Sequence, residues 1–128
     1  MNLLLDTHIA LWAITDDAKL PMRARELIQS SRNTVWVSAA NVWEIAIKHA
    51  LARGDMPVSS HDALRYFTES GYLFLPVKAE HAVAVEDLPG HHQDPFDRIL
   101  VAQALVEPMR LVTHDPLVAL YGDTIIKV

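Results

Sequence analysis

The hydrophobic residues of the chain fall into short apolar runs separated by stretches of mixed polarity. Runs of this length that are rich in β-branched and aromatic side chains are typical of β-strands. The run at residues 2–6 is apolar up to its final aspartate, which favours a strand buried on both faces of a parallel sheet. We expect strands at "NLLLD" (2–6), "NTVWVS" (33–38), "YLFLPV" (72–77), "RLVT" (110–113) and "TIIKV" (124–128).

The stretches between these runs carry apolar residues at helical spacing. Ser38 is a favourable N-cap and Gly54 a favourable stop for a helix over 39–54, and Gly71 ends a helix over 61–70. Further helices are expected at 8–13, within 19–31 with Pro21 near the start, at 78–88, at 95–107 and, as a short element, at 116–121. Because strands and helices alternate without an internal repeat or linker, the pattern predicts one α/β domain over residues 1–128. Its central sheet should be mostly parallel and flanked by helices.

The composition narrows the class of protein. A chain of 128 residues with 51% hydrophobic content can bury a core without disulfides or a structural metal. It has no cysteine, which excludes disulfide and thiolate chemistry and suits a cytoplasmic protein. The first apolar run is interrupted by Asp6 and His8 and has no basic leader, so we expect neither a membrane span nor a secretory signal.

The formal net charge of −5 argues against a general electrostatic nucleic-acid binder, which needs a cationic face. This argument from net charge is weaker for a single local nucleic-acid site. A divalent cation held by carboxylates would reverse the field at the place where a phosphate docks.

Four acidic residues occupy corresponding positions around the predicted sheet. Asp6 ends the first strand, Glu44 lies in the early turns of the helix after the second strand, Asp97 lies in the first turn of a later helix, and Asp115 follows "RLVT". In a parallel sheet, strand ends and helix starts lie at the same edge. We therefore expect the four carboxylates to converge.

Each acid also has a local explanation. Asp6, Asp97 and Asp115 could cap helices, and Glu44 could pair with Lys48 one turn later. Purely local roles do not explain why the four acids would lie together, because converging carboxylates repel one another unless a cation lies among them. Hard oxygen ligands suit Mg²⁺ or Mn²⁺ better than zinc. One or two such ions can activate water and neutralise the charge that develops on a phosphodiester.

Four segments carry a family resemblance. "LLLDTHIALW", "SAANVWEIAIK", "DPFDRILVAQA" and "LVTHD" resemble, in order, the four acidic blocks of the PIN domain, and specifically those of bacterial VapC-like toxins. The resemblance extends over essentially the whole chain. It implies a Mg²⁺- or Mn²⁺-dependent ribonuclease that cleaves RNA, forms a homodimer and is held inactive by a cognate antitoxin.

The resemblance also assigns roles to residues. It implies that Asp6, Glu44, Asp97 and Asp115 are the catalytic, metal-site acids. Asp94 matches an additional acid of the "DPFDR" version of the motif and is expected to support the site or to cap the helix. Thr7 and Thr113 lie beside the cluster, where a hydroxyl could orient a ligand or a water molecule.

Several basic and aromatic residues have two interpretations. Arg98 is a candidate phosphate contact or a salt-bridge partner that positions an acid, and His114 either contacts substrate or fills the turn. His91 and His92 match no zinc-binding spacing, so we expect a solvated loop pair. The remaining residues are given structural roles: local packing for His8; a solvated helix face for Lys48, His49 and Arg53; core or interface positions for Trp12, Trp36 and Trp43.

Three other function classes compete with a nuclease. A receiver-type signalling domain also places acids at this edge, but it would have an acidic pair after the first strand, where Asp6 is followed by Thr7 and His8. A phosphatase of the haloacid dehalogenase type lacks its second aspartate for the same reason. A non-catalytic binding module would keep the fold without the chemistry, and the presence of all four acids speaks against it.

Overall fold

A five-stranded sheet forms the centre of the computed structural model, which describes residues 1–52 and 56–128. The strands are β1 (Asn2–Leu5), β2 (Thr34–Ser38), β3 (Leu73–Leu75), β4 (Arg110–Thr113) and β5 (Ile125–Lys127). Their order is β3-β2-β1-β4-β5, and all four strand pairings are parallel. The predicted α/β class is confirmed, with a sheet that is parallel throughout.

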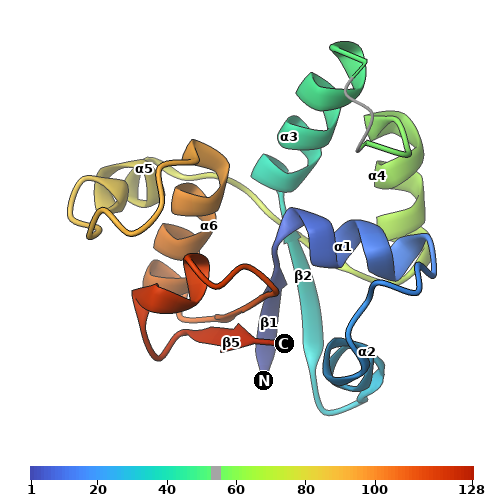
Figure 1. Cartoon of the computed structure of the whole chain (residues 1–128), viewed down its shortest axis with the longest axis horizontal. Helices are drawn as coiled ribbons and strands as arrows, with labels where there is room; N and C mark the ends of the chain where they lie inside the picture. The colour runs from blue at the N-terminus through green and yellow to red at the C-terminus, as the bar shows by residue number, and fades with distance from the viewer. Residues whose placement is uncertain (53–55) are drawn as a thin grey trace.

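Helices cover both faces of this sheet. Figure 1 shows α1, α2, α3 and α4 on one side and α5 and α6 on the other. Their bounds are α1 (Thr7–Ile14), α2 (Met22–Gln29), α3 (Ala39–Ala50), α4 (Ser60–Glu69), α5 (Ala79–Val85) and α6 (Pro95–Val106), and a 3₁₀ helix, η1, spans Val118–Tyr121. Each end lies within three residues of its predicted position where the structure describes both ends. The predicted stop at Gly54 and the basic residue Arg53 lie outside the described residues.

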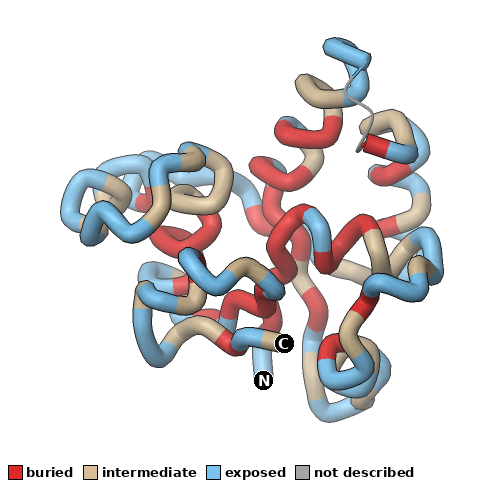
Figure 2. The backbone as a smooth tube through the Cα atoms, in the orientation of Figure 1, coloured by how far each residue is buried: buried red, intermediate tan, exposed pale blue. Residues whose placement is uncertain are grey.

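Burial on both faces explains why the β1 sequence is apolar without alternation. Leu3 and Leu5 pack in the core under α1 to α4, whereas Leu4 packs in the second core against α6. In Figure 2 the buried residues gather along the central strands and the adjoining turns of α1, α3 and α6. Successive strand residues point to opposite faces, so both faces of a doubly covered strand must be apolar.

Polar residues set the starts of the helices that frame the site. The Asp6 carboxylate accepts a hydrogen bond from the Ile9 amide at the start of α1. Ser38 caps α3 as predicted, accepting from the Ala40 amide. Gly71 follows α4 with a φ of +80°, a conformation that favours glycine.

The tryptophans divide between core and surface. Trp12 and Trp36 are partly buried and pack against the two cores. Trp43 is 62% exposed and its ring packs edge-on against Phe96 at 5.2 Å, so a core position for Trp43 is wrong. Because Trp43 lies on the α3 surface that carries an apolar pocket, the interface interpretation remains for this residue.

The connections from β1 and β4 create the crevice in which a ligand would bind. β1 lies between β2 and β4, so the chain leaves the centre of the sheet in opposite directions. In such sheets, ligands bind outside the carboxyl ends of the strands at this switch point. Asp6 follows β1 and Asp115 follows β4 at that edge. Among the described helices, none has the length and apolar character needed to cross a membrane.

Candidate metal centre

Asp6 is held rigidly at the end of β1. Its Oδ1 accepts from the Ile9 amide at 2.9 Å, and its Oδ2 accepts from the Thr113 hydroxyl at the end of β4. The residue is only 5% exposed. Burial raises the pKa of Asp6, and the charge of Asp115 adds to this, while the Thr113 and Ile9 hydrogen bonds oppose it. Thr113 therefore orients the Asp6 carboxylate. Its predicted action on a bound ligand or water molecule stays a prediction.

Glu44 is held in a buried network on α3. Its Oε1 accepts from the Thr7 hydroxyl at 2.6 Å, and its Oε2 accepts from Lys48 Nζ at 2.6 Å. Asn41 Nδ2 donates to the same Thr7 oxygen at 2.9 Å, and Asn41 Oδ1 accepts from the Ser38 amide. The local pairing of Glu44 with Lys48 is thus present, and both oxygens of Glu44 are occupied. We call Asp6 and Glu44 the inner pair.

The two aspartates of the "DPFDR" segment have different tasks. Asp94 caps α6, with Oδ1 accepting from the amides of Phe96 at 2.8 Å and Asp97 at 3.2 Å. Asp97 lies in the first turn of α6, and its side chain does not cap the helix. Burial raises the pKa of Asp97 to about 7, followed in effect by the charges of Asp94, Asp6 and Glu44, while His92 lowers it. Asp97 therefore feels the inner pair electrostatically across the site.

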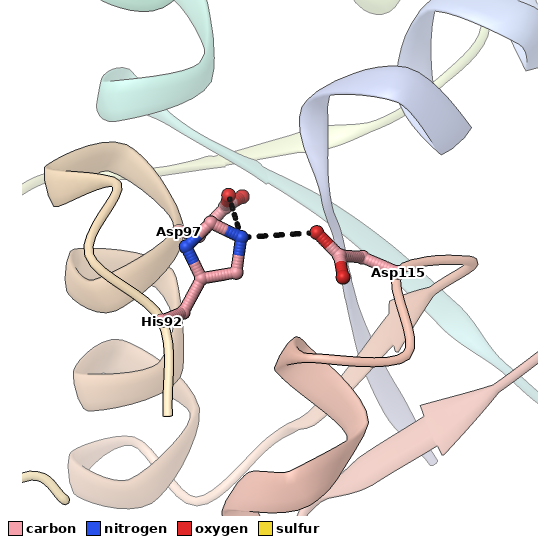
Figure 3. Close-up of side chains that lie close together, drawn as sticks. All are labelled: His92, Asp97 and Asp115. Carbon is pink, nitrogen blue, oxygen red and sulfur yellow. Dashed lines mark hydrogen bonds and ion pairs between the residues drawn. The ribbon is translucent and has the colours of Figure 1, made fainter. Parts of the chain in front are cut away.

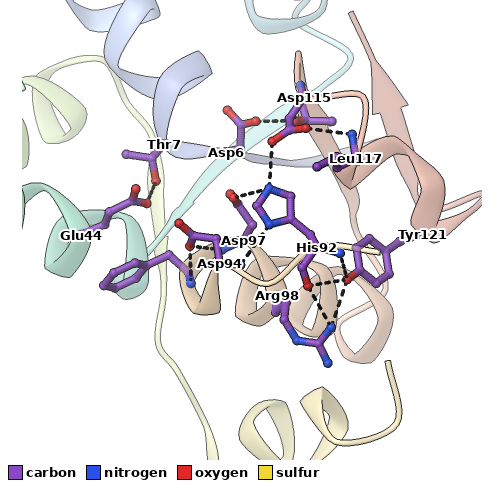
Figure 4. Close-up of polar contacts among 12 residues, drawn as sticks. Asp6, Thr7, Glu44, His92, Asp94, Asp97, Arg98, Asp115, Leu117 and Tyr121 are labelled. Atoms are coloured by element: carbon purple, nitrogen blue, oxygen red, sulfur yellow. Dashed lines mark hydrogen bonds and ion pairs between the residues drawn. The ribbon is translucent and has the colours of Figure 1, made fainter. Parts of the chain in front are cut away.

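Asp115 completes the cluster from the loop after β4. Its Oδ1 accepts from the Leu117 amide at 2.8 Å, and its own amide donates to the Thr113 hydroxyl at 3.0 Å. The side chain is 36% exposed and that of Asp97 is 23% exposed. We call Asp97 and Asp115 the outer pair, and the four acids together the acidic cluster, whose convergence Figure 4 shows.

His92 lies between the two outer carboxylates. Its Nε2 is 3.2 Å from Asp97 Oδ2 and 3.0 Å from Asp115 Oδ2, as Figure 3 shows. One ligand atom from each of these three residues lies within 4.8 Å of the others, the closest metal-ligating set among the described residues. The expectation of a solvated pair is wrong for His92, because its side chain is only 15% exposed. His91 is exposed and its ring packs edge-on against Tyr121.

Arg98 points away from the acids. Its guanidinium donates to the carbonyl oxygens of Val85 at 3.0 Å and Pro89 at 2.9 Å, and to the Tyr121 hydroxyl at 3.1 Å. No ion pair joins Arg98 to a carboxylate in the described part of the chain, so the salt-bridge interpretation is wrong. The side chain instead anchors the loop that carries His92. A contact between Arg98 and a phosphate stays a prediction.

A pocket opens beside the acidic cluster. It has a volume of about 250 Å³ and is lined by two acids, two histidines and a tryptophan: Asp6, Asp115, His8, His114 and Trp12. The His8 and Trp12 rings are 5.8 Å apart, which is the local packing expected for His8. His114 is exposed, with Nδ1 2.6 Å from the Val128 carbonyl oxygen. Its predicted contact with substrate remains a prediction.

A larger pocket of about 370 Å³ lies on another part of the surface. It is lined by apolar side chains of α3, α5 and α6, including Trp43, Phe96 and Ile99, and by none of the acidic cluster. This pocket can offer apolar contact area but no acid-base or metal chemistry.

The donor set of the acidic cluster fits a hard divalent cation. Carboxylate oxygens from four different elements converge, and the pKa of Asp97 is raised by burial and by neighbouring negative charges. A cation among the carboxylates would favour their charged forms and reverse that shift. Lys48 already forms an ion pair with Glu44, whereas among the described residues no lysine or arginine forms an ion pair with Asp6, Asp97 or Asp115. All four predicted acids are therefore brought together.

Three further residues of the site were not predicted from the sequence. Asn41 connects Ser38 to Thr7, and a signal for it was present, since Asn41 stands three positions after the Ser38 cap. His92 and Tyr121 carried no such local signal, because the contacts of His92 with Asp115 and with Tyr121 join segments that are distant in sequence.

Comparison with known proteins supports the fold independently. A family model described as PIN domain matches residues 3–120. A chain from the crystal structure of VapBC2 from Rickettsia felis bound to a DNA fragment from their promoter has the same fold, with a TM-score of 0.69 and 18% sequence identity. The match covers 100% of this chain and 98% of that one. No curated protein sequence gives a significant match.

Proposed function

The chain belongs to the PIN domain family, and from this premise we propose that it is a metal-dependent endoribonuclease, the toxin of a VapBC-type toxin-antitoxin pair. The proposal is supported above all by the acidic cluster at the switch point of the sheet, where the charges of buried Asp6 and of Glu44 act on Asp97. Membership of the PIN domain family excludes the receiver and phosphatase alternatives.

The two pairs of acids would hold the ion in different ways. Within residues 1–52 and 56–128, the side-chain hydrogen bonds and ion pairs of Asp97 involve His92 alone, so its oxygens have the fewest protein contacts to give up for an ion. Asp115 has one oxygen engaged by a backbone amide and the other by His92. We assign Mg²⁺ or Mn²⁺ to the outer pair together with Asp6, with Glu44 acting through water.

The protein's own residues prepare the reaction. When bound, the cation supplies Lewis acidity toward a phosphodiester and makes water a nucleophile at neutral pH. Thr113 holds the Asp6 carboxylate in one orientation, and Thr7 and Lys48 do the same for Glu44. Because these acids are fixed before an ion or substrate arrives, little reorganisation is needed during the reaction.

The pocket beside Asp6 and Asp115 is the proposed place for RNA. It combines two carboxylates of the acidic cluster with the rings of Trp12, His8 and His114. Aromatic and imidazole rings can stack on unpaired bases, a common feature of single-stranded RNA recognition. With a net charge of −5, the chain needs the cation to attract the phosphate backbone.

An antitoxin and a second copy of the chain are the proposed protein partners. The structural neighbour comes from a VapBC2 complex bound to promoter DNA, which supports a cognate antitoxin. The apolar pocket at Trp43 and Phe96 is a suitable interface for one of these partners. Such a protein would act in the cytoplasm.

Cleavage of RNA by the purified protein tests this function. The protein is freed of any copurifying partner and incubated with structured RNAs, including transfer RNAs, in Mg²⁺, Mn²⁺ or EDTA. We expect metal-dependent cleavage that falls by more than about 100-fold in Asp6→Asn and Asp97→Asn, since even outer-shell changes at metal sites cost 10- to 100-fold.

Asp123→Asn is the matched control, because Asp123 is exposed and lies outside the acidic cluster. It should cleave at the wild-type rate. Full activity in Asp6→Asn and Asp97→Asn would overturn the assignment of the acids. Metal binding without cleavage of any RNA would favour a non-catalytic binding module.

A further inference from the structure

His92 bridges the outer pair at the place where an ion would bind. We propose that His92 is a built-in competitor of the divalent cation: a neutral N–H donor that closes the acidic cluster and must release it when the ion enters. The proposal rests on the proposed function, in which Asp97 and Asp115 are metal ligands. Its first support is the position of Nε2, 3.2 Å and 3.0 Å from their Oδ2 atoms.

The ring of His92 is held in one tautomer. The Asp94 amide donates to His92 Nδ1 at 3.0 Å, so Nδ1 carries a lone pair and the ring proton of the neutral form lies on Nε2. Nε2 then donates toward Asp97 and Asp115. A histidine that binds a metal through Nε2 needs a lone pair there. In this arrangement His92 is a donor to the acids rather than a ligand.

The backbone of His92 is fixed from two sides. Its amide donates to the Tyr121 hydroxyl at 3.0 Å, and the Tyr121 hydroxyl donates back to the His92 carbonyl oxygen at 3.3 Å. Arg98 Nη1 also donates to that carbonyl at 3.3 Å, while Arg98 donates to the carbonyl oxygens of Val85, at the end of α5, and of Pro89 in the loop that carries His92. Figure 4 shows this clamp behind the imidazole. The ring therefore reaches the acids from an anchored loop.

His92 and the ion would compete because both use the same carboxylate oxygens. The Nε2–H group points at the same two oxygens that a shared cation would bind, and a proton donor and a cation cannot both occupy that place. An N–H donor between two carboxylates partly compensates their repulsion. Because the ion must displace this hydrogen bond, the presence of His92 should lower the affinity of the protein for the ion.

Manganese binding measures this cost without RNA. The affinity of the full chain for Mn²⁺ is measured by calorimetry, with free Mn²⁺ followed by electron paramagnetic resonance. We expect His92→Ala and His92→Phe to bind Mn²⁺ about 2- to 10-fold more tightly than wild type, because one competing hydrogen bond to charged groups is lost. The phenylalanine variant keeps a ring of similar size and so controls for a change in packing.

Two further variants separate positioning from local chemistry. Tyr121→Phe removes the hydroxyl clamp and keeps the imidazole, so a smaller tightening is expected. His61→Ala changes an exposed histidine on α4 and should leave the affinity unchanged. Thermal unfolding by circular dichroism checks that each variant is folded before its affinity is compared.

Weaker Mn²⁺ binding in both His92 variants would make His92 a ligand, and unchanged binding would make it a bystander; either result overturns the proposal. Asp97→Asn reports on the underlying function separately. If it binds Mn²⁺ as well as wild type, the metal centre itself is misassigned. If Asp97→Asn loses the ion while the His92 variants bind it no more tightly, only the competition is wrong.

Discussion

The inner pair and the outer pair of the acidic cluster are built in opposite ways. Asp6 and Glu44 are each 5% exposed and have both oxygens engaged by protein donors. Asp97 and Asp115 have more exposed side chains and share one histidine. In line with the proposed function, we infer from this difference that the inner pair is a fixed scaffold, whereas the outer pair would exchange a protein contact for an ion.

The largest expected effect is the loss of metal-induced stabilisation when the outer pair is changed. At a Mn²⁺ concentration of about 100 times Kd, binding to the native state adds about 2.7 kcal/mol of stability, or roughly 5 to 10 °C in Tm. Asp97→Asn should lose most of this shift in a thermal scan, and Asp123→Asn should keep it. An equal shift in Asp97→Asn would mean that the ion binds elsewhere.

The next effect concerns the scaffold that holds the inner pair. Thr7→Val removes the hydroxyl between Glu44 and Asn41 and leaves buried polar atoms without a partner. We expect a loss of about 1 to 3 kcal/mol in the free energy of unfolding, measured with urea. Thr68→Val, at an exposed position on α4, should cost no more than about 0.5 kcal/mol. Similar losses in both variants would argue against a specific buried network.

Asp97 should also make stability depend on pH when no metal is present. The native pKa of Asp97, about 7, lies above its ordinary value of 3.8, so the native state binds more protons than the unfolded state between these values. The unfolding free energy of wild type in EDTA should therefore fall as pH rises from about 4 to 7.

Asp97→Asn, which mimics the protonated acid, should escape this fall and be more stable than wild type at pH 8. We expect a difference of about 1 to 2 kcal/mol, reduced by solvent screening of the partly exposed side chain. Urea unfolding of both proteins over this pH range measures it. Parallel pH profiles for the two proteins would contradict the shift.

The smallest expected effect concerns Glu107, outside the site. Its contribution to stability depends on pH in the direction opposite to that of Asp97. Glu107 accepts from buried His81 at 2.5 Å, and this hydrogen bond, with help from Lys78, lowers the pKa of Glu107. Its stabilising contribution is present above the ordinary pKa and is lost as pH falls through the native value. Glu107→Gln should thus be less stable than wild type at pH 7, with the difference fading in acid. A difference that grows in acid would contradict the sign.

The fold was predictable because each element carries its own signal. The apolar runs marked the strands, and Ser38 and Gly71 marked a start and an end of helices. The convergence of the acids followed from topology, since the carboxyl ends of parallel strands meet at one edge. What the sequence left open is how far each acid is already compensated, which depends on side-chain contacts such as that of Thr113 with Asp6.

The missed residues depend on contacts between distant segments. His92 reaches Asp115 across 23 positions of sequence, and Tyr121 clamps it across 29. The path of the loop that carries His92 is set by Arg98, whose role also differs from the expected salt bridge. No spacing rule covers such a loop, because its course is decided by hydrogen bonds to backbone carbonyls and not by local propensity.

In the proposed arrangement, the outer pair binds the ion together with Asp6, while the inner pair keeps its protein contacts. The most direct test is an anomalous difference map from crystals of this protein grown or soaked with Mn²⁺. We expect a peak in contact with oxygens of Asp97, Asp115 and Asp6, His92 withdrawn from the outer pair, and unchanged contacts of Asp6 with Thr113 and of Glu44 with Thr7. A peak remote from the outer pair, or no peak at a Mn²⁺ concentration that saturates binding in solution, would contradict it.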